Sequence, residues 1–158
     1  MLRLSSDRRN IIGIDYDDEK IGIAKNTARD IDGIDFESAD ISKDPIPAGD
    51  IYILNDVLHY LPQEMQLSVL GQCMDQLSDR GKIILRDTDT DLKKRTLYAK
   101  FTEFQSTKVF RFNKTQYDLS YLSGRTIKEY IEGRDFTLSR FDKSKFTSNI
   151  TYVITHKV

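Results

Sequence analysis

Short apolar runs alternate with longer amphipathic segments along the first half of the chain. Four runs rich in isoleucine and tyrosine lie at Asn10–Ile14, Ile34–Ser38, Asp50–Asn55 and Lys82–Arg86. Each run is too short for a helix and lacks strict alternation of apolar and polar residues, a pattern typical of a strand buried on both faces. We therefore expect four buried strands in this half.

Helical spacing fills two of the intervals between these runs. In Asp17–Asp30 the apolar residues recur at helical spacing, and the acids at its start suit the positive end of a helix dipole. Pro62–Leu77 carries a broad apolar stripe, and we expect Gly81 to end the connection that follows it. Strand, helix and strand joined by short links predict parallel βαβ units and a sheet with helices on both faces.

The last third of the chain has a different pattern. Thr126–Glu132 has helical spacing and is followed by Gly133, which is expected to end that helix. Phe136–Phe141 and Ile150–His156 alternate well enough to form an antiparallel pair at the edge of the sheet. Because 158 residues is the length of one domain, we expect a single α/β domain over the whole chain.

Composition removes several classes of function. Lys and Arg number 24 and Asp and Glu 25, and this balance argues against a nucleic-acid partner. Cys73 is the only cysteine and His59 and His156 are the only histidines, so no disulfide framework and no metal centre built on these residue types is expected. No apolar run approaches the ~20 residues that cross a bilayer, and no signal-peptide core begins the chain. These features predict a cytoplasmic protein without membrane insertion.

Carboxylates follow the first two expected strands. Ligands of an open parallel sheet bind beyond the carboxyl ends of its strands, which is where Asp15 and Asp40 stand. A carboxylate at one strand end can accept both hydroxyls of a ribose, and a second on the next strand can accept from an adenine amine. The alternative is that each acid caps a helix or a loop, which is the more frequent role of a single such residue. Taken together with the motifs that follow, the two acids favour a nucleoside ligand.

Six segments resemble, in the same order, motifs of class I S-adenosylmethionine-dependent methyltransferases. They are Asn10–Lys25, Glu37–Ile41, the Val-Leu-His-Tyr-Leu turn within Asp50–Pro62, Leu77–Asp87 with Asp79 and Arg80 in place of the usual Pro-Gly, Gly133–Phe136 and Ile150–Val158. The resemblance rests on the order of these segments, which extends along nearly the whole chain.

The resemblance implies a Rossmann-like, mostly parallel sheet with an antiparallel C-terminal strand pair. It also implies S-adenosylmethionine as cofactor and methyl transfer to a small-molecule acceptor. In this scheme Asp15 binds the ribose and Asp40 the adenine amine. The other residues expected to line the cofactor site are Tyr16, Ala39, Ile41, Asn55, Val57 and Leu58.

One element of the family is absent from this chain. The family's first strand ends in a Gly-x-Gly-x-Gly turn, whereas Gly13 and Gly22 lie in the expected first strand and its helix. Met1–Arg9 resembles only the tail of the helix that follows that turn, so the fold is expected to be N-terminally truncated. Because the absent strand is central, its neighbours need other partners. The chain is the C-terminal portion of a longer protein, pairs its first and third strands directly, or forms a homodimer; we favour the first explanation.

The transfer reaction itself requires little from the protein. The sulfonium methyl is already activated, so in-line positioning of the acceptor does most of the work, and a base is needed only where the acceptor must lose a proton. His59 stands at the correct rim for a base that titrates near neutrality. The alternative is a histidine that caps the turn before Pro62. His156, in an edge strand, and Cys73, on an apolar helix face, are expected to be structural.

The acceptor pocket is expected after Asp87. Asp91–Gln105 has helical spacing, and aromatic residues concentrate from there on, which favours a second hydrophobic core over an aromatic lid. The aromatic residues are Tyr98, Phe101, Phe104, Phe110, Phe112, Tyr117 and Tyr121.

Two other functional classes fit the same pattern. A non-catalytic Rossmann-like remnant, retained for dimerisation or partner binding, accounts for the missing turn. A nicotinamide dehydrogenase fits less well, because its fingerprint requires the glycines that this chain lacks.

Overall fold

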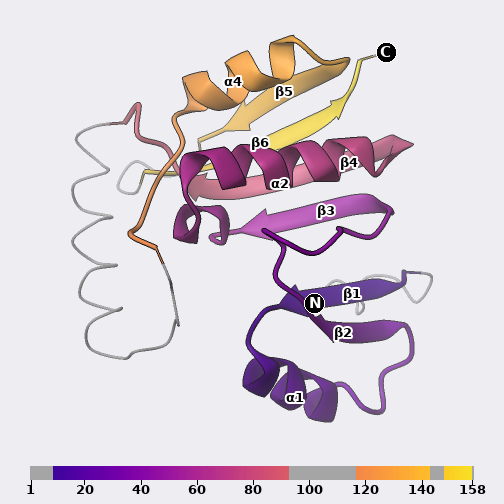
Figure 1. Ribbon diagram of the computed structural model, residues 1–158. Coiled ribbons are helices and arrows are strands. Elements are labelled where there is room, and N and C mark those ends of the chain that lie inside the picture. Colours follow the sequence, from indigo (N-terminus) through magenta and orange to yellow (C-terminus); the bar gives the residue numbers. More distant parts are fainter. Residues whose placement is uncertain (1–8, 93–116, 143–147, 158) are drawn as a thin grey trace. The chain divides into compact units, whose positions relative to one another are not determined.

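A computed structural model of the chain describes residues 9–92, 117–142 and 148–157 (Figure 1). The chain divides into two compact units, Met1–Pro45 and Ile46–Val158. The expected helix over Asp91–Gln105 lies almost wholly outside the described residues, as do all the aromatic residues listed above except Tyr117 and Tyr121. No helix in the described ranges is long and apolar enough to cross a membrane.

The first unit is a single βαβ element. Strand β1 (Ile11–Asp15) pairs in parallel with β2 (Ile34–Ser38), and helix α1 (Asp18–Thr27) connects them. The helix begins there because the Asp17 side chain accepts a hydrogen bond of 3.1 Å from the backbone N–H of Glu19. The expected parallel unit at the start of the chain is confirmed.

The second unit is built on a four-stranded sheet. Its elements are β3 (Gly49–Asn55), the 3₁₀ turn η2 (Leu58–Tyr60), α2 (Gln63–Asp75), β4 (Leu77–Thr88), α4 (Gly124–Glu132), β5 (Phe136–Phe141) and β6 (Asn149–His156). The strand order is β3-β4-β6-β5, with β3 parallel to β4 and β6 antiparallel to both of its neighbours. The parallel β3-α2-β4 unit and the C-terminal antiparallel pair are both confirmed.

Helices α2 and α4 lie side by side in the second unit (Figure 1). A Cβ atom on Gly71 of α2 would lie 2.6 Å from the Tyr130 hydroxyl of α4, and Arg134 Nη1 lies 3.3 Å from Asp75 Oδ1. Only a close approach of the two helices allows these contacts. Beneath them the core consists mainly of Val69, Leu70, Cys73, Ile83, Leu85, Ile150, Tyr152 and Ile154.

Cys73 is part of this core, as expected. It is 1% exposed on α2, and burial raises the pKa of its thiol to about 12. The thiol therefore stays protonated at neutral pH and behaves as a small apolar side chain.

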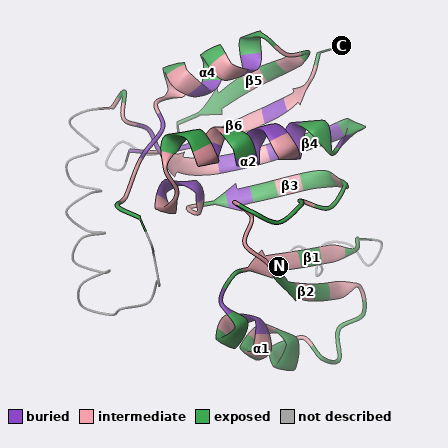
Figure 2. Ribbon diagram, viewed as in Figure 1, coloured by how far each residue is buried: buried purple, intermediate pink, exposed green. Residues whose placement is uncertain are grey.

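The expectation that every strand is buried on both faces is wrong for the first three. In β3, Ile51 and Ile53 are 52% and 47% exposed, and Ile12 in β1 is 48% exposed. Parts of β2 and β3 have the colour of exposed residues in Figure 2. In the second unit the reason is that α2 and α4 both pack on the face that carries Leu54 and its neighbours. The described residues of that unit supply no layer for the opposite face of the sheet.

Gly81 does not end the connection after α2, contrary to expectation. Strand β4 begins at Leu77 and continues through Gly81, where a Cβ atom would lie 2.8 Å from the backbone oxygen of Asp50. The register of β3 and β4 shifts between Gly49 and Ile51 at this point. Gly81 thus allows a close backbone approach inside the sheet and does not mark the end of the connection.

Strand β6 is not an edge strand, contrary to the expectation for His156. It lies between β4 and β5, and β5 takes the edge position. Buried and half-buried residues alternate along β6, and the buried ones are Ile150, Tyr152 and Ile154. This alternation is typical of an inner strand covered on one face. His156 packs against Phe136, with 4.4 Å between ring centroids, as a structural residue.

The described residues do not pair the first strand with the third. In the hydrogen-bonding pattern β1 has β2 as its partner and β3 has β4, in two separate sheets.

Candidate functional site

Asp15 lies where the two strands of the first unit end together. It is the last residue of β1, and its backbone oxygen accepts a hydrogen bond of 3.1 Å from the N–H of Ala39, just after β2. Its Oδ1 accepts from the Asp17 N–H at 3.0 Å, and its Oδ2 lies 3.9 Å from Lys20 Nζ. A carboxylate has about four lone-pair directions, so Asp15 retains capacity for a diol.

Asp40 lies at the same rim and is more strongly engaged. Its Oδ1 accepts hydrogen bonds from the Ser42 N–H at 3.0 Å and from the Ser42 hydroxyl at 2.6 Å. Its Oδ2 accepts from Lys43 Nζ at 2.7 Å. The hydrogen bonds from Lys43 and from Ser42 lower the pKa of Asp40 below its ordinary value. These contacts are those of a loop cap, and its role toward an adenine amine stays a prediction.

The remaining predicted residues of the first unit flank these acids. Tyr16 follows Asp15 and is 47% exposed. Ala39 and Ile41 flank Asp40 and are half-buried. The structure therefore brings all five predicted residues of this unit to the carboxyl ends of two adjacent parallel strands.

The rim of the second unit begins with a left-handed residue. Asp56 follows β3 with φ 53°, and its N–H donates a hydrogen bond of 2.8 Å to the Arg86 backbone oxygen. Its carboxylate accepts from Arg86 Nη1 and from Asn55 Nδ2. Burial raises the pKa of Asp56, and the Arg86 charge opposes that rise. The turn directs the chain from Asn55 into η2.

Both carboxylate oxygens of Asp87 hold His59. His59 Nδ1 lies 2.7 Å from Asp87 Oδ1, and the His59 backbone N–H donates to Asp87 Oδ2 at 3.3 Å. Asp87 comes from β4, next to β3 in the sheet, which is why a residue just after β3 can reach it. With Nδ1–H donating to Asp87, the lone pair of a neutral imidazole is on Nε2.

The His59 ring is enclosed. It is 1% exposed and stacks on Tyr121 with 5.2 Å between ring centroids and an interplanar angle of 28°. Tyr60 packs at 4.2 Å on a tilted plane. Leu58 is also 1% exposed, so its side chain belongs to the core, whereas Asn55 is exposed and Val57 half-buried. The hydrogen bond between His59 Nδ1 and Asp87 favours an imidazole oriented by Asp87 over a histidine that caps the turn before Pro62.

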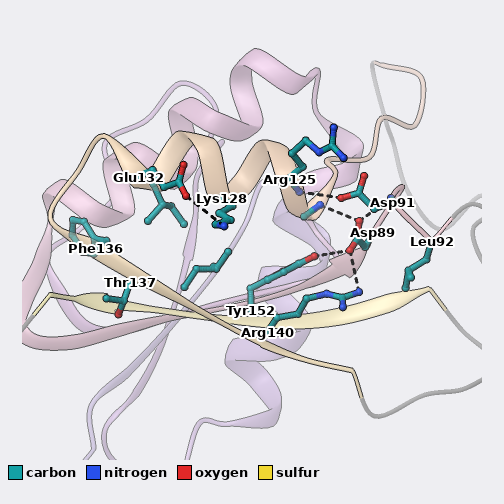
Figure 3. A pocket seen from close by; sticks show the side chains of 13 residues that line it. Asp89, Asp91, Leu92, Arg125, Lys128, Glu132, Phe136, Thr137, Arg140 and Tyr152 are labelled. Atoms are coloured by element: carbon teal, nitrogen blue, oxygen red, sulfur yellow. Dashed lines mark hydrogen bonds and ion pairs between the residues drawn. The ribbon is translucent and has the colours of Figure 1, made fainter.

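A separate hollow of about 740 Å³ lies beside α4 and contains none of the predicted site residues (Figure 3). Its buried acid, Asp89, accepts hydrogen bonds from the Tyr152 hydroxyl at 2.8 Å and from the Gly124 N–H at 2.9 Å. Arg140 lies 3.4 Å from the same carboxylate. These contacts of Asp89 form a structural junction at one end of the hollow.

Sequence reasoning missed Gln66 and the contact of Tyr121 with His59. Gln66 is 1% exposed, and its Nε2 donates 2.7 Å hydrogen bonds to the backbone oxygens of Leu61 and Ser120. The signal was a polar residue three positions before Val69 on the buried side of α2. In the sequence Asp87 was identified only as the start of the expected acceptor pocket, and its contact with His59 was missed.

Comparison with protein families decides the family. The model described as an O-methyltransferase domain matches residues 14–118, about two thirds of the chain. The chain belongs to this family. The resemblance to class I S-adenosylmethionine-dependent methyltransferases is thereby confirmed. A search of curated proteins found no match.

Solved structures support the same fold. The apo S-adenosylmethionine-dependent methyltransferase SibL has a TM-score of 0.75 at 17% identity, over 99% of this chain and 46% of that one. A second similar structure is the O-methyltransferase NcsB1 from neocarzinostatin biosynthesis, in complex with S-adenosylmethionine and 2-hydroxy-5-methyl naphthoic acid. Its TM-score is 0.68 at 13% sequence identity, and the match covers 98% of this chain and 44% of NcsB1. A structure described as a pericyclic reaction enzyme has a TM-score of 0.70 at 15% sequence identity, and the match covers 99% of this chain and 39% of that enzyme. The chain thus spans less than half of each structure, and identities this low show the fold alone.

Proposed function

We propose that this chain forms the catalytic region of an S-adenosylmethionine-dependent O-methyltransferase with a small-molecule acceptor. The observation that carries the proposal is the 2.7 Å contact between His59 Nδ1 and Asp87 Oδ1 in a member of the O-methyltransferase domain family. A hydroxyl acceptor must lose a proton as it attacks, and an oriented imidazole is suited to take it. A related structure that holds both S-adenosylmethionine and a hydroxylated naphthoic acid supports this acceptor class.

The first unit provides residues that fit an adenosine. Asp15 retains acceptor capacity for the ribose hydroxyls, and Asp40 lies at the adjacent strand end for the adenine amine, beside Tyr16, Ala39 and Ile41. When bound, S-adenosylmethionine supplies a methyl group activated by its sulfonium. Contacts of Asn55, Val57 and Leu58 with the cofactor stay predictions, and the buried side chain of Leu58 leaves its backbone for such a contact.

In the proposed mechanism His59 removes the acceptor's proton. Asp87 fixes the imidazole with Nδ1 as donor, so Nε2 accepts the hydroxyl proton. The negative charge of Asp87 then stabilises the imidazolium that forms. Because His59 is 1% exposed, the residues that cover it must move before an acceptor reaches Nε2.

We also propose that the chain is the C-terminal portion of a longer, cytoplasmic enzyme. The missing glycine-rich turn and the 39–46% share of the matched structures support a longer enzyme. A homodimer remains a prediction, which light scattering of the complete protein tests. Cell fractionation tests the location.

The decisive experiment uses the complete reading frame that contains these residues. Calorimetric titration with S-adenosylhomocysteine is expected to show binding by the complete protein and weak or no binding by residues 1–158 alone, because the methionine cradle is missing. Micromolar binding by residues 1–158 would contradict the second expectation. Asp15→Ala should abolish binding, whereas Asp35→Ala, an exposed acid on β2, should not. Equal binding by Asp15→Ala and wild type overturns the ribose assignment.

The second candidate is a non-catalytic module. It is favoured by the missing turn and by the engagement of both Asp40 oxygens with Ser42 and Lys43. A complete protein that binds no S-adenosylhomocysteine yet dimerises or retains a partner would support this alternative and exclude the methyltransferase.

A further inference from the structure

Gln66 joins two segments that are distant in the sequence. Its side-chain amide donates to the Leu61 backbone oxygen, just before α2, and to the Ser120 backbone oxygen, just before α4, both at 2.7 Å. The side chain is 1% exposed. An apolar residue of the same size would leave two partly buried backbone oxygens without this donor, which is costly. The junction therefore depends on the two hydrogen bonds that the Gln66 amide donates, and an apolar side chain that only filled the same space would not replace them.

Residues 117–122, here called the strap, are fastened at the same place by a second set of bonds. The Ser120 N–H donates to the His59 backbone oxygen at 2.9 Å, so both backbone groups of Ser120 are held. Gln63 Nε2 reaches the Tyr121 backbone oxygen at 3.4 Å, a longer and weaker contact. Gln66 therefore makes the shorter of the two side-chain contacts to the strap.

The strap carries the ring that covers His59. Tyr121 is 5% exposed and stacks on one face of the imidazole, while Asp87 binds its Nδ1. Whatever holds the backbone at Ser120 also sets the position of the next residue's ring. The covering of His59 is thereby coupled to the Gln66 amide.

We propose that Gln66 is a positioning residue that latches the strap over His59, so that the imidazole stays covered by Tyr121 and held in its Nδ1–H form by Asp87. The proposal rests on the proposed function only for the role of His59 as the base. The latch itself is a matter of contacts within the second unit and can be tested without any methyl acceptor.

The test uses the reactivity of individual histidines. The complete protein is treated with diethyl pyrocarbonate, and the rate of modification at His59 is read by peptide mass spectrometry. Gln66→Met keeps the volume and removes both donors, so His59 should be modified about tenfold faster or more, because local opening becomes less costly. His156, outside the strap, should react at its wild-type rate and serves as the internal reference.

Two variants of α2 serve as controls. Gln72→Met makes the same substitution at a half-buried position of the same helix and should leave His59 unchanged. Val69→Ala removes core packing from a residue that is 0% exposed, without touching the latch. If Gln66→Met does not accelerate the reaction at His59, or if Val69→Ala accelerates it equally, the proposal is overturned.

A second variant covers the case in which Gln66→Met does not fold. Tyr121→Ala removes the ring and leaves the Gln66 bonds in place, so it should also expose His59. In its NMR spectrum the His59 Cε1–H signal should lose the ring-current shift imposed by the stacked Tyr121 ring, while Asp87 still holds the Nδ1–H tautomer. A His59 as slow to react in Tyr121→Ala as in wild type would show that the strap does not cover the imidazole.

The two proposals fail separately. A complete protein that transfers no methyl group, yet shows the expected acceleration in Gln66→Met, refutes the methyltransferase and leaves the latch intact. An active enzyme in which Gln66→Met leaves His59 reactivity unchanged refutes the latch alone.

Discussion

The Tyr152 hydroxyl donates a 2.8 Å hydrogen bond to Asp89 Oδ2 and so ties the middle of β6 to the start of α4 (Figure 3). The other oxygen of Asp89 accepts from the Gly124 N–H, the first residue of that helix. Asp89 is 2% exposed, and a carboxylate buried to this extent is tolerated only when its oxygens are bonded. The pKa of Tyr152 is raised, mainly by burial and further by the hydrogen bond to Asp89. The hydroxyl therefore stays protonated and acts as a donor.

Removing this acid should destabilise the second unit strongly. We expect Asp89→Ala to lower the free energy of unfolding by about 3 kcal/mol and Tyr152→Phe by about 1–2 kcal/mol, because each leaves buried polar groups unpaired. Urea denaturation measures both. Glu129→Ala, at an exposed position of α4, is the control and should change the free energy of unfolding by less than about 0.5 kcal/mol. A cost for Asp89→Ala no larger than the control's would show that the junction is not stabilising.

Two glycines should respond in opposite directions to the same substitution. A Cβ at Gly81 would lie 2.8 Å from the Asp50 backbone oxygen, and backbone in a sheet cannot move aside, so Gly81→Ala should cost about 2 kcal/mol or more. Gly22, inside α1, has nothing within 4 Å of such an atom, and Gly22→Ala should stabilise by about 0.5–1 kcal/mol. Amide exchange followed by mass spectrometry reads each unit separately. If Gly22→Ala destabilised the first unit, as Gly81→Ala is expected to destabilise the second, the expectation that α1 accepts an added methyl group would be contradicted.

Local pattern predicted the early elements well, because their signals lie within each segment. Ile34–Ser38 is a strand with the bounds expected, and α1 begins next to the acids that suit the positive end of its dipole. The role of Gly81 was predicted wrongly, because a glycine that permits close approach looks in sequence like one that ends a connection. Only the neighbouring strand, with the Asp50 oxygen 2.8 Å away, distinguishes the two.

The candidate site was predictable only as far as strand order determines it. Parallel strands predict that Asp15 and Asp40 share a rim, and they do. The pairing of His59 with Asp87 follows from β3 and β4 being neighbours, which the resemblance implied without showing the contact. Gln66 was not predictable, because its partner Ser120 lies beyond a long stretch without a clear periodic pattern and only tertiary structure brings it near.

Asp40 should make the first unit sensitive to acid. Its pKa is lowered in the folded chain from the ordinary 3.8, chiefly by the hydrogen bonds from Lys43 and Ser42. A lowered carboxyl pKa means that the unfolded state binds more protons between the two values, so stability rises with pH across that window. The advantage of wild type over Asp40→Asn should be complete above about pH 5 and vanish as pH falls through the folded pKa. Thermal unfolding at a series of pH values checks this, and a difference that persists at pH 2 would contradict it.

The charge of Asp87 should matter more for methyl transfer than for cofactor binding. Asp87→Asn keeps the shape of the side chain but removes the negative charge that would stabilise an imidazolium at His59, 2.7 Å away. We expect kcat of the complete protein to fall by about 10²–10⁴-fold, the usual contribution of a general base, with the Kd for S-adenosylhomocysteine unchanged. Asp79→Asn, at an exposed position of the same strand, is the matched control and should retain full activity. Because the base acts only on acceptors that lose a proton, an acceptor supplied already ionised should recover most of the rate in Asp87→Asn. Wild-type turnover by Asp87→Asn with a protonated acceptor would remove His59 from the chemistry while leaving the adenosine assignment to Asp15 intact.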